Sequence, residues 1–175
     1  TNTASNAEAC VGGIEGNSYG SEINNCYNTG AISGGSSSSK YVGGISGNLN
    51  SSATVKNCFN TGTISNGSST YRKAIAYKTS GTISNCYFLS GNSTDTNATS
   101  KNATAFSDGT VTKLLQSGNL ELVWGQTINT DSYPVFYNGS NALGVDATGV
   151  TVDPTTVTVG VGKTVTLTAT VTPEH

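Results

Sequence analysis

Apolar and polar positions alternate in short segments over the first hundred residues, and the segments recur. Residues 23–32 and 55–64 share the order Ile/Val-x-Asn-Cys-aromatic-Asn-Thr-Gly-x-Ile, and residues 83–89 repeat its first half. Short alternating segments bounded by Asn and Gly are typical of β-strands joined by tight turns. A spacing of about thirty residues between equivalent positions predicts repeating units, each of which buries an apolar face against the next.

Each unit also begins with a glycine-rich apolar segment. The sequence is Val-Gly-Gly-Ile-Glu-Gly at 11–16, Val-Gly-Gly-Ile-Ser-Gly at 42–47, and a degraded Ala-Ile-Ala at 74–76. This gives roughly three strands per unit, which one turn of a parallel β-helix requires, and strands of successive turns stack about 4.8 Å apart in register. We therefore predict an all-β chain with a short right-handed parallel β-helix of three to four turns over residues 1–104.

The repeat pattern ends after residue 104. Residues 108–118 predict a short helix with Asp108 or Thr110 as its N-cap and Gly118 as its stop. Trp124 and the aromatic run 133–137 follow. Large aromatic residues at the end of an array indicate a cap that shields the last turn, so we assign residues 105–141 to such a cap. A ligand site at Trp124 is the alternative.

Residues 142–175 have a different pattern. Segments 150–159 and 163–171 alternate apolar and polar residues around Gly-Val-Gly at 160–162, which predicts two antiparallel strands of a sandwich sheet. Since two strands do not form a stable sandwich, we expect the rest of that domain to lie beyond residue 175. The chain has no Met, and we interpret it as a module of a longer polypeptide.

Composition limits the remaining choices. Only 34% of residues are hydrophobic and 10% are charged, while Gly, Ser, Thr and Asn make up about half of the chain. A thin, elongated core suits this composition better than a globular one. The eight Lys and Arg are scattered and the formal net charge is −2, which argues against a nucleic-acid partner. The sequence contains no run of eighteen or more apolar residues, so we predict no membrane-spanning segment.

Two resemblances follow from these motifs. The Val-Gly-Gly-Ile-x-Gly element followed by Asn-Cys-Tyr/Phe-Asn-Thr-Gly, over roughly 11–89, resembles the GLUG-type repeats of bacterial surface and secreted proteins. The Val-Asp-Pro and Lys-Thr-Val-Thr-Leu-Thr elements of 150–173 resemble the opening strands of the bacterial Ig-like domain group 2. Together they imply an extracellular or cell-surface location and a role as stalk, spacer, attachment or binding element. Neither family supplies catalytic residues.

The cysteines are the first candidates for chemistry. Cys26, Cys58 and Cys86 occupy equivalent positions and would form one ladder, which we interpret as small buried hydrophobic side chains. Disulfides suit both the ladder spacing and an extracellular chain, but three equivalent cysteines cannot all pair, and Cys10 lies off the ladder. Their redox state stays open. Because there is no Cys-x-x-Cys pair and the single His is His175, we predict no metal site.

The aromatic residues after each cysteine, Tyr27, Phe59 and Tyr87, are the candidate ligand-binding residues. If each Cys points inward, alternation turns these rings outward into a stripe that stacks against sugar rings. Counting from Ile23 instead places Asn25 and Tyr27 inside, and only a bend at the asparagines reconciles the two counts. We favour burial of at least part of each ring.

Two further residue types have a structural interpretation. Asn28 and Asn60 recur at one repeat position, and we predict that their amides bond along the stack, as in other in-register β-structures. Glu15 and Glu22 do not recur in the second unit, so we do not interpret them as a glycosidase carboxylate pair.

The sequence thus predicts a non-catalytic chain without cofactors, since no Ser-His or Cys-His arrangement can be assembled. We expect a monomeric extracellular repeat module that acts in adhesion, in binding a glycan or a host or cell-surface protein, or as a spacer. The alternative is an accessory segment of a polysaccharide-active enzyme whose catalytic domain lies outside these residues.

Overall fold

The structure, a computed structural model of the 175-residue chain, describes residues 9–34, 41–65, 71–143 and 147–173. The chain divides into two compact units, residues 1–143 and 144–175. Strands dominate the described part, and its helices are the short α1 (Ala103–Ser107) and α2 (Thr110–Gln116). This agrees with the predicted all-β class.

Three repeats supply most of the strands. Repeat 1 contains β1 (Cys10–Gly12), β2 (Glu15–Tyr19), β3 (Glu22–Asn24), β4 (Tyr27–Asn28) and β5 (Ile32–Ser33). Repeat 2 contains β6 (Tyr41–Gly43), β7 (Ser46–Asn50), β8 (Thr54–Lys56), β9 (Phe59–Asn60) and β10 (Ile64–Ser65). Repeat 3 contains β11 (Arg72–Lys73), β12 (Ala76–Lys78), β13 (Thr82–Ser84) and β14 (Tyr87–Leu89), and β15 (Thr99–Lys101) follows it. Repeats 1 and 2 each have five short strands, more than the three predicted.

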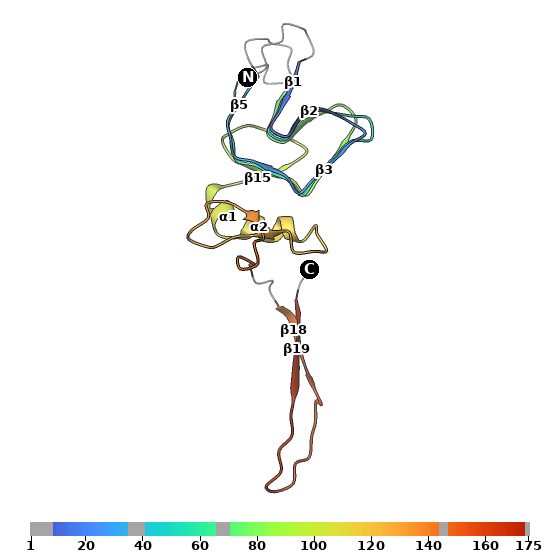
Figure 1. Ribbon diagram of the computed structural model, residues 1–175, viewed down its shortest axis with the longest axis vertical. Helices are drawn as coiled ribbons and strands as arrows, with labels where there is room; N and C mark the ends of the chain where they lie inside the picture. The colour runs from blue at the N-terminus through green and yellow to red at the C-terminus, as the bar shows by residue number, and fades with distance from the viewer. Residues whose placement is uncertain (1–8, 35–40, 66–70, 144–146, 174–175) are drawn as a thin grey trace. The chain divides into compact units, whose positions relative to one another are not determined.

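Equivalent strands of the repeats pair in parallel. The sheets have the orders β1-β6-β11, β12-β7-β2, β13-β8-β3, β15-β14-β9-β4 and β10-β5. The register aligns like with like: Ile23 pairs with Val55, and Val55 pairs with Ile83. In Figure 1 the strands of successive repeats lie over one another when the stack is viewed from its end. The predicted in-register ladders are therefore present.

The glycine-rich corner brings two sheets close together. A Cβ atom added at Gly43 would lie 1.9 Å from the Ser46 carbonyl oxygen, so no side chain fits there. In repeat 3 the equivalent residue is Lys73, and the register between β12 and β7 shifts between Ala76 and Tyr77, leaving no partner for Gly47. The degraded corner of repeat 3 thus has a different local geometry.

The core follows the ladders. The main cluster lies inside the repeats and comprises Ile23, Ile45, Leu49, Ala53, Val55, Cys58, Ala74, Ile75, Ala76, Cys86 and Phe88. A smaller cluster joins Val42 to Ile32 and Ile64. These narrow clusters are the thin core that the composition predicts.

The end of repeat 3 is closed by the loop between β14 and β15. The Asp95 carboxylate, 7% exposed, accepts the backbone N–H groups of Ile75 (3.0 Å) and Ala76 (3.2 Å). In repeat 2 the same two N–H groups, of Ile45 and Ser46, donate to the Ile75 carbonyl. Asp95 therefore takes the place of the carbonyl that a fourth repeat would supply.

Residues 102–143, which we call the lateral cover, lie along the side of the stack and correct the prediction of an end cap. The cover contains α1, α2, β16 (Trp124–Gly125) and β17 (Val135–Phe136), and its helices lie beside the β15 side of the stack in Figure 1. It reaches all three repeats, because Trp124 bonds to Asn25, Gly118 to Asn57 and Leu114 to Asn85. The predicted helix is present as α2, but its N-cap is Gly109 and not Asp108 or Thr110. The helix α1, which Asn102 caps, was not predicted.

The second unit contains β18 (Ala147–Asp153) and β19 (Thr168–Pro173), which pair antiparallel as predicted. Both strands are shorter on the loop side than predicted, since residues 154–167 form no strand. Pro154 has no N–H to continue the ladder, which agrees with the end of β18 at Asp153.

Candidate functional site

A bend at one asparagine of each repeat decides where the candidate residues point. Asn25, Asn57 and Asn85 have φ values of 53°, 52° and 46°. Asn is among the few residues that tolerate this left-handed conformation. The bend interrupts strict alternation, so the cluster inside the repeats includes Ile23 and also takes in Cys26. The bend that reconciles the two ways of counting is thus confirmed, at the asparagine before each cysteine.

The candidate ligand-binding aromatics form a ladder that the lateral cover buries. Tyr27 pairs in register with Phe59, and Phe59 with Tyr87. The rings of Tyr27 and Phe59 are stacked, with centroids 5.0 Å apart and planes 6° apart. Phe59 is 0% and Tyr87 8% exposed, and Tyr27 is half-buried. These three rings therefore do not form the exposed stripe that sugar stacking requires, because they pack against the residues of the lateral cover.

Trp124 belongs to the same packing. It is 1% exposed, its ring centroid lies 5.7 Å from that of Phe59, and its indole N–H donates to Asn25 Oδ1 at 3.0 Å. Phe106, Val111 and Leu115 complete the buried cluster. A buried Trp with its N–H satisfied is a packing residue, so the structure favours a packing role under the lateral cover over a ligand site at this position.

The bend asparagines also bind the cover. Asn85 donates to Asn57 Oδ1 at 2.8 Å and to the Leu114 carbonyl at 3.1 Å. Asn25 donates to Asn119 Oδ1 at 2.8 Å, and Asn57 contacts the same oxygen at 3.4 Å. The amides therefore form a network that joins the three repeats to one another and to the cover.

The second asparagine ladder has the predicted axial bond. Asn28 Nδ2 donates to Asn60 Oδ1 at 2.7 Å, and each side chain also bonds to the glycine two residues on, Gly30 or Gly62. In repeat 3 the partner of Asn60 is Phe88, which joins the core instead. The ladder is structural and stops where the amide is replaced.

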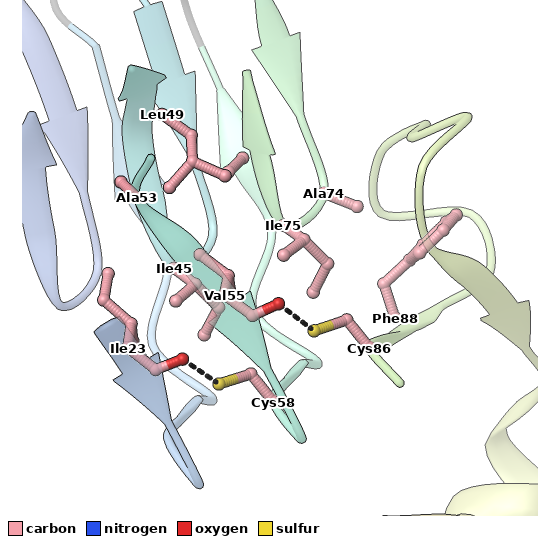
Figure 2. Packing of buried hydrophobic residues seen from close by; sticks show 11 residues of the cluster. Ile23, Ile45, Leu49, Ala53, Val55, Cys58, Ala74, Ile75, Cys86 and Phe88 are labelled. Atoms are coloured by element: carbon pink, nitrogen blue, oxygen red, sulfur yellow. Dashed lines mark hydrogen bonds between the residues drawn. The ribbon is translucent and has the colours of Figure 1, made fainter. Parts of the chain in front are cut away.

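The three ladder cysteines point into the core as thiols. Figure 2 shows Cys58 Sγ directed at the Ile23 carbonyl (3.8 Å) and Cys86 Sγ at the Val55 carbonyl (3.6 Å). Cys58 and Cys86 are buried, Cys26 is half-buried, and none forms a disulfide in this structure. Cys10 pairs in register with Tyr41, as predicted, away from this ladder.

Neighbouring thiols make these cysteines weak acids. The hydrogen bond with Cys58, followed by burial, raises the pKa of Cys26 far above its ordinary value. A hydrogen bond from Cys26 lowers the pKa of Cys58, but the hydrogen bond with Cys86 and burial outweigh it and raise that pKa to about 12. The thiolate is the reactive form, so this environment suits packing rather than nucleophilic or redox chemistry.

Glu15 and Glu22 each have a structural partner. Glu15 Oε2 accepts the hydroxyl groups of Ser18 (2.7 Å) and Ser21 (3.1 Å). Glu22 pairs with Lys56 of repeat 2 at 2.7 Å. Glu15 is thus bonded within β2 and to the turn that follows it, whereas the Glu22–Lys56 pair joins β3 to β8.

A tyrosine cluster that the sequence did not predict lies on repeats 2 and 3. It consists of Tyr41 before the corner of repeat 2, and Tyr71 and Tyr77 on either side of the corner of repeat 3. Tyr41 and Tyr77 are stacked, with centroids 4.6 Å and planes 28° apart. Tyr71 stands edge-on to both, at 5.1 Å and 5.4 Å. All three are half-buried.

Basic residues accompany this cluster in the sequence. Arg72 and Lys73 form β11, directly after Tyr71, and Lys78 follows Tyr77 in β12. Residues 71–78 include no acidic residue. Tyr71 is the repeat equivalent of Tyr41, so their thirty-residue spacing was a signal for this contact. Tyr77 follows the register shift between β12 and β7, and the repeat pattern does not place its side chain.

No group of three or more His, Cys, Asp or Glu residues within the described ranges is arranged to hold a metal ion. Among the same residues, no helix has the length and hydropathy to cross a membrane. Comparison of the chain with protein-family models, with curated proteins and with solved structures finds no match.

Proposed function

We propose that this chain is a non-catalytic repeat module of a bacterial surface or secreted protein that binds glycan chains through the tyrosine cluster. The observation that carries the proposal is the mutual contact of Tyr41, Tyr71 and Tyr77, three half-buried rings. Tyr rings present an apolar face for the C–H face of a sugar and a hydroxyl for its polar rim. Because each ring holds its neighbours, little side-chain entropy is lost on binding.

The surroundings of the cluster favour a glycan over an apolar ligand. Arg72, Lys73 and Lys78 supply N–H donors close in sequence to the rings, and sugar hydroxyls accept such bonds. The sites Tyr27, Phe59 and Tyr87 do not enter this proposal, since they are packed under the lateral cover.

The module itself is proposed to be a short right-handed parallel β-helix of GLUG-type repeats, followed by the start of an Ig-like domain. In-register parallel pairing over three repeats supports the first, and the antiparallel pair β18–β19 supports the second. The proposed location outside the cell follows from these two resemblances. A spacer role is the outcome left if no ligand binds.

The test is binding of the whole chain to a glycan array, followed by titration of the best glycan. Tyr77→Ala is expected to weaken binding at least tenfold, whereas Tyr77→Phe, which keeps the ring, retains most of it. Tyr19→Ala is the matched control, because Tyr19 is 76% exposed and lies in repeat 1. Fluorescence of the buried Trp124 verifies that each variant is folded.

Two results would overturn the proposal. Equal binding by Tyr77→Ala, Tyr19→Ala and the unaltered chain would remove the cluster from the site. Failure of the unaltered chain to bind any glycan, with its fold intact, would leave the spacer role.

A further inference from the structure

We propose that the outer edge of repeat 1 is a docking surface for one further repeat of the same kind, stacked in register on the side opposite repeat 2. The proposal is independent of the tyrosine cluster. It rests on the hydrogen bonds that join repeats 1, 2 and 3, on the different ways in which the two ends of the stack are finished, and on the exposure of one isoleucine.

Each junction between repeats uses the same bonds at the glycine-rich corner. The N–H groups of Ile14 (3.0 Å) and Glu15 (3.1 Å) donate to the Ile45 carbonyl. The N–H groups of Ile45 (2.9 Å) and Ser46 (3.1 Å) donate in turn to the Ile75 carbonyl. Two adjacent donors of one repeat therefore meet one carbonyl of the next, and the stack has a direction.

The two ends of the stack differ. At repeat 3 the outward-facing donors, on Ile75 and Ala76, are taken by the Asp95 carboxylate. At repeat 1 the outward-facing group is the Ile14 carbonyl, which accepts no backbone N–H from the described residues. One end is closed by a side chain, and the other presents the acceptor that joins successive repeats.

Two side chains at the outer edge of repeat 1 also have the environment expected where a further repeat would stack. Ile14 is 50% exposed, whereas the equivalent Ile45 and Ile75 are both 0% exposed. Asn60 Oδ1 accepts from both Asn28 Nδ2 and the Gly62 N–H, whereas Asn28 Oδ1 accepts only the Gly30 bond among the described residues. The edge thus offers an apolar position and an amide oxygen in the register of the repeat.

The occupant must bring two adjacent N–H donors at a tight corner, an isoleucine beside them and an asparagine amide further on. A Gly-Gly-Ile-x-Gly corner followed by Asn-Cys-aromatic-Asn has these groups, so the partner is a further repeat. A second copy of this chain does not present them, because Asp95 occupies the donors at its repeat 3 end. A repeat that stacks on repeat 1 as repeat 1 stacks on repeat 2 is therefore the partner that we propose.

The test duplicates residues 41–70 immediately before Cys10, which preserves the thirty-residue step between Tyr41 and Tyr71. The matched control carries Gly43→Val and Gly44→Val in the duplicated segment only, because a Cβ at Gly43 meets the Ser46 carbonyl oxygen at 1.9 Å. Thermal unfolding is followed by Trp124 fluorescence, and hydrogen exchange by mass spectrometry. A synthetic 41–70 peptide, titrated against the unaltered chain, provides a second measurement should the duplication fail to fold.

The duplicated corner is expected to exchange at least tenfold more slowly than in the valine control, and the unfolding midpoint to rise by about 4 °C or more. The peptide is expected to bind saturably and its valine version not to bind. Equal exchange and equal midpoints in both duplications, with no peptide binding, would overturn the proposal. A dimer of the unaltered chain that Ile14→Asp dissociates would overturn it in favour of a second copy.

Discussion

Replacement of Asp95 by alanine removes the group that closes repeat 3. Its carboxylate accepts the N–H groups of Ile75 (3.0 Å), Ala76 (3.2 Å) and Asn97 (2.9 Å), and Ile75 and Ala76 are both 0% exposed. A hydrogen bond to a charged group contributes about 1.5–3 kcal/mol, and a buried donor left without a partner costs about 1–3 kcal/mol. Since water enters part of the space that is left, we expect a loss of about 3 kcal/mol in the free energy of unfolding.

Urea unfolding, followed by Trp124 fluorescence, measures this loss. With an m value of about 2 kcal/mol/M, the midpoint is expected to fall by about 1.5 M. Asp95→Asn keeps one carbonyl oxygen as an acceptor and loses the charge, so its expected cost is about 1 kcal/mol. Glu22→Ala is the matched control, because its carboxylate bonds to Lys56 at an exposed position where an ion pair contributes about 0–1 kcal/mol.

The urea midpoints of Asp95→Ala and Glu22→Ala decide whether the Asp95 carboxylate closes repeat 3. If Asp95→Ala and Glu22→Ala unfold at the same urea concentration, the carboxylate does not replace a fourth repeat, and the end of the stack is closed by other contacts. Hydrogen exchange localises the effect, since the amides of Ile75 and Ala76 are expected to lose protection first in Asp95→Ala.

Three further outcomes follow from the site. In native protein Cys58 is expected to resist a thiol-reactive disulfide at pH 8 and to react only after unfolding. Because folding raises the pKa of Cys58 from 9.0 to about 12, the folded state holds this proton more tightly than the unfolded state does. The free energy of unfolding is therefore expected to fall as the pH rises from about 9 to 12, which urea midpoints measure. Phe59→Ala is expected to cost about 3–5 kcal/mol by leaving a cavity under the cover, and a cost below 1 kcal/mol in urea unfolding would contradict the packing. Asn57→Gly is expected to be about 1 kcal/mol more stable than Asn57→Ala, because glycine accepts a φ of 52° without strain; equal midpoints would argue against the bend.

The repeat pattern predicted the ladders because in-register stacking needs only the spacing of equivalent residues. Val11 over Val42, Ile32 over Ile64 and Asn28 over Asn60 follow from that spacing alone. The direction of the aromatic rings could not be read in the same way. Alternation assumes extended backbone at every residue, and the positive φ of Asn25 and its equivalents breaks the count between Ile23 and Tyr27.

The lateral position of the cover and the position of Tyr77 in the tyrosine cluster escaped prediction for reasons of sequence distance and register. Trp124 bonds to Asn25 across 99 positions, and no periodic pattern connects them. Tyr77 meets Tyr41 because β12 slips by one residue where repeat 3 lacks a counterpart of Gly47. Tyr71 lies over Tyr41 in the ordinary register of the repeat, so only the position of Tyr77 and the contacts of the cover depend on departures from the repeat.

The bend asparagine explains why the stack needs the cover along its side. In each repeat the residue after the bend, such as Cys58, enters the core inside the repeats, and the next, such as Phe59, belongs to the cluster under the cover. A strand segment with apolar residues on both sides of the backbone must be covered on both. The amide at the bend meets this requirement directly, because Asn57 and Asn85 both hold the turn and bond to the cover. A substitution at the bend is therefore expected to disturb the core and the cover together, which a ladder residue such as Val55 would not do.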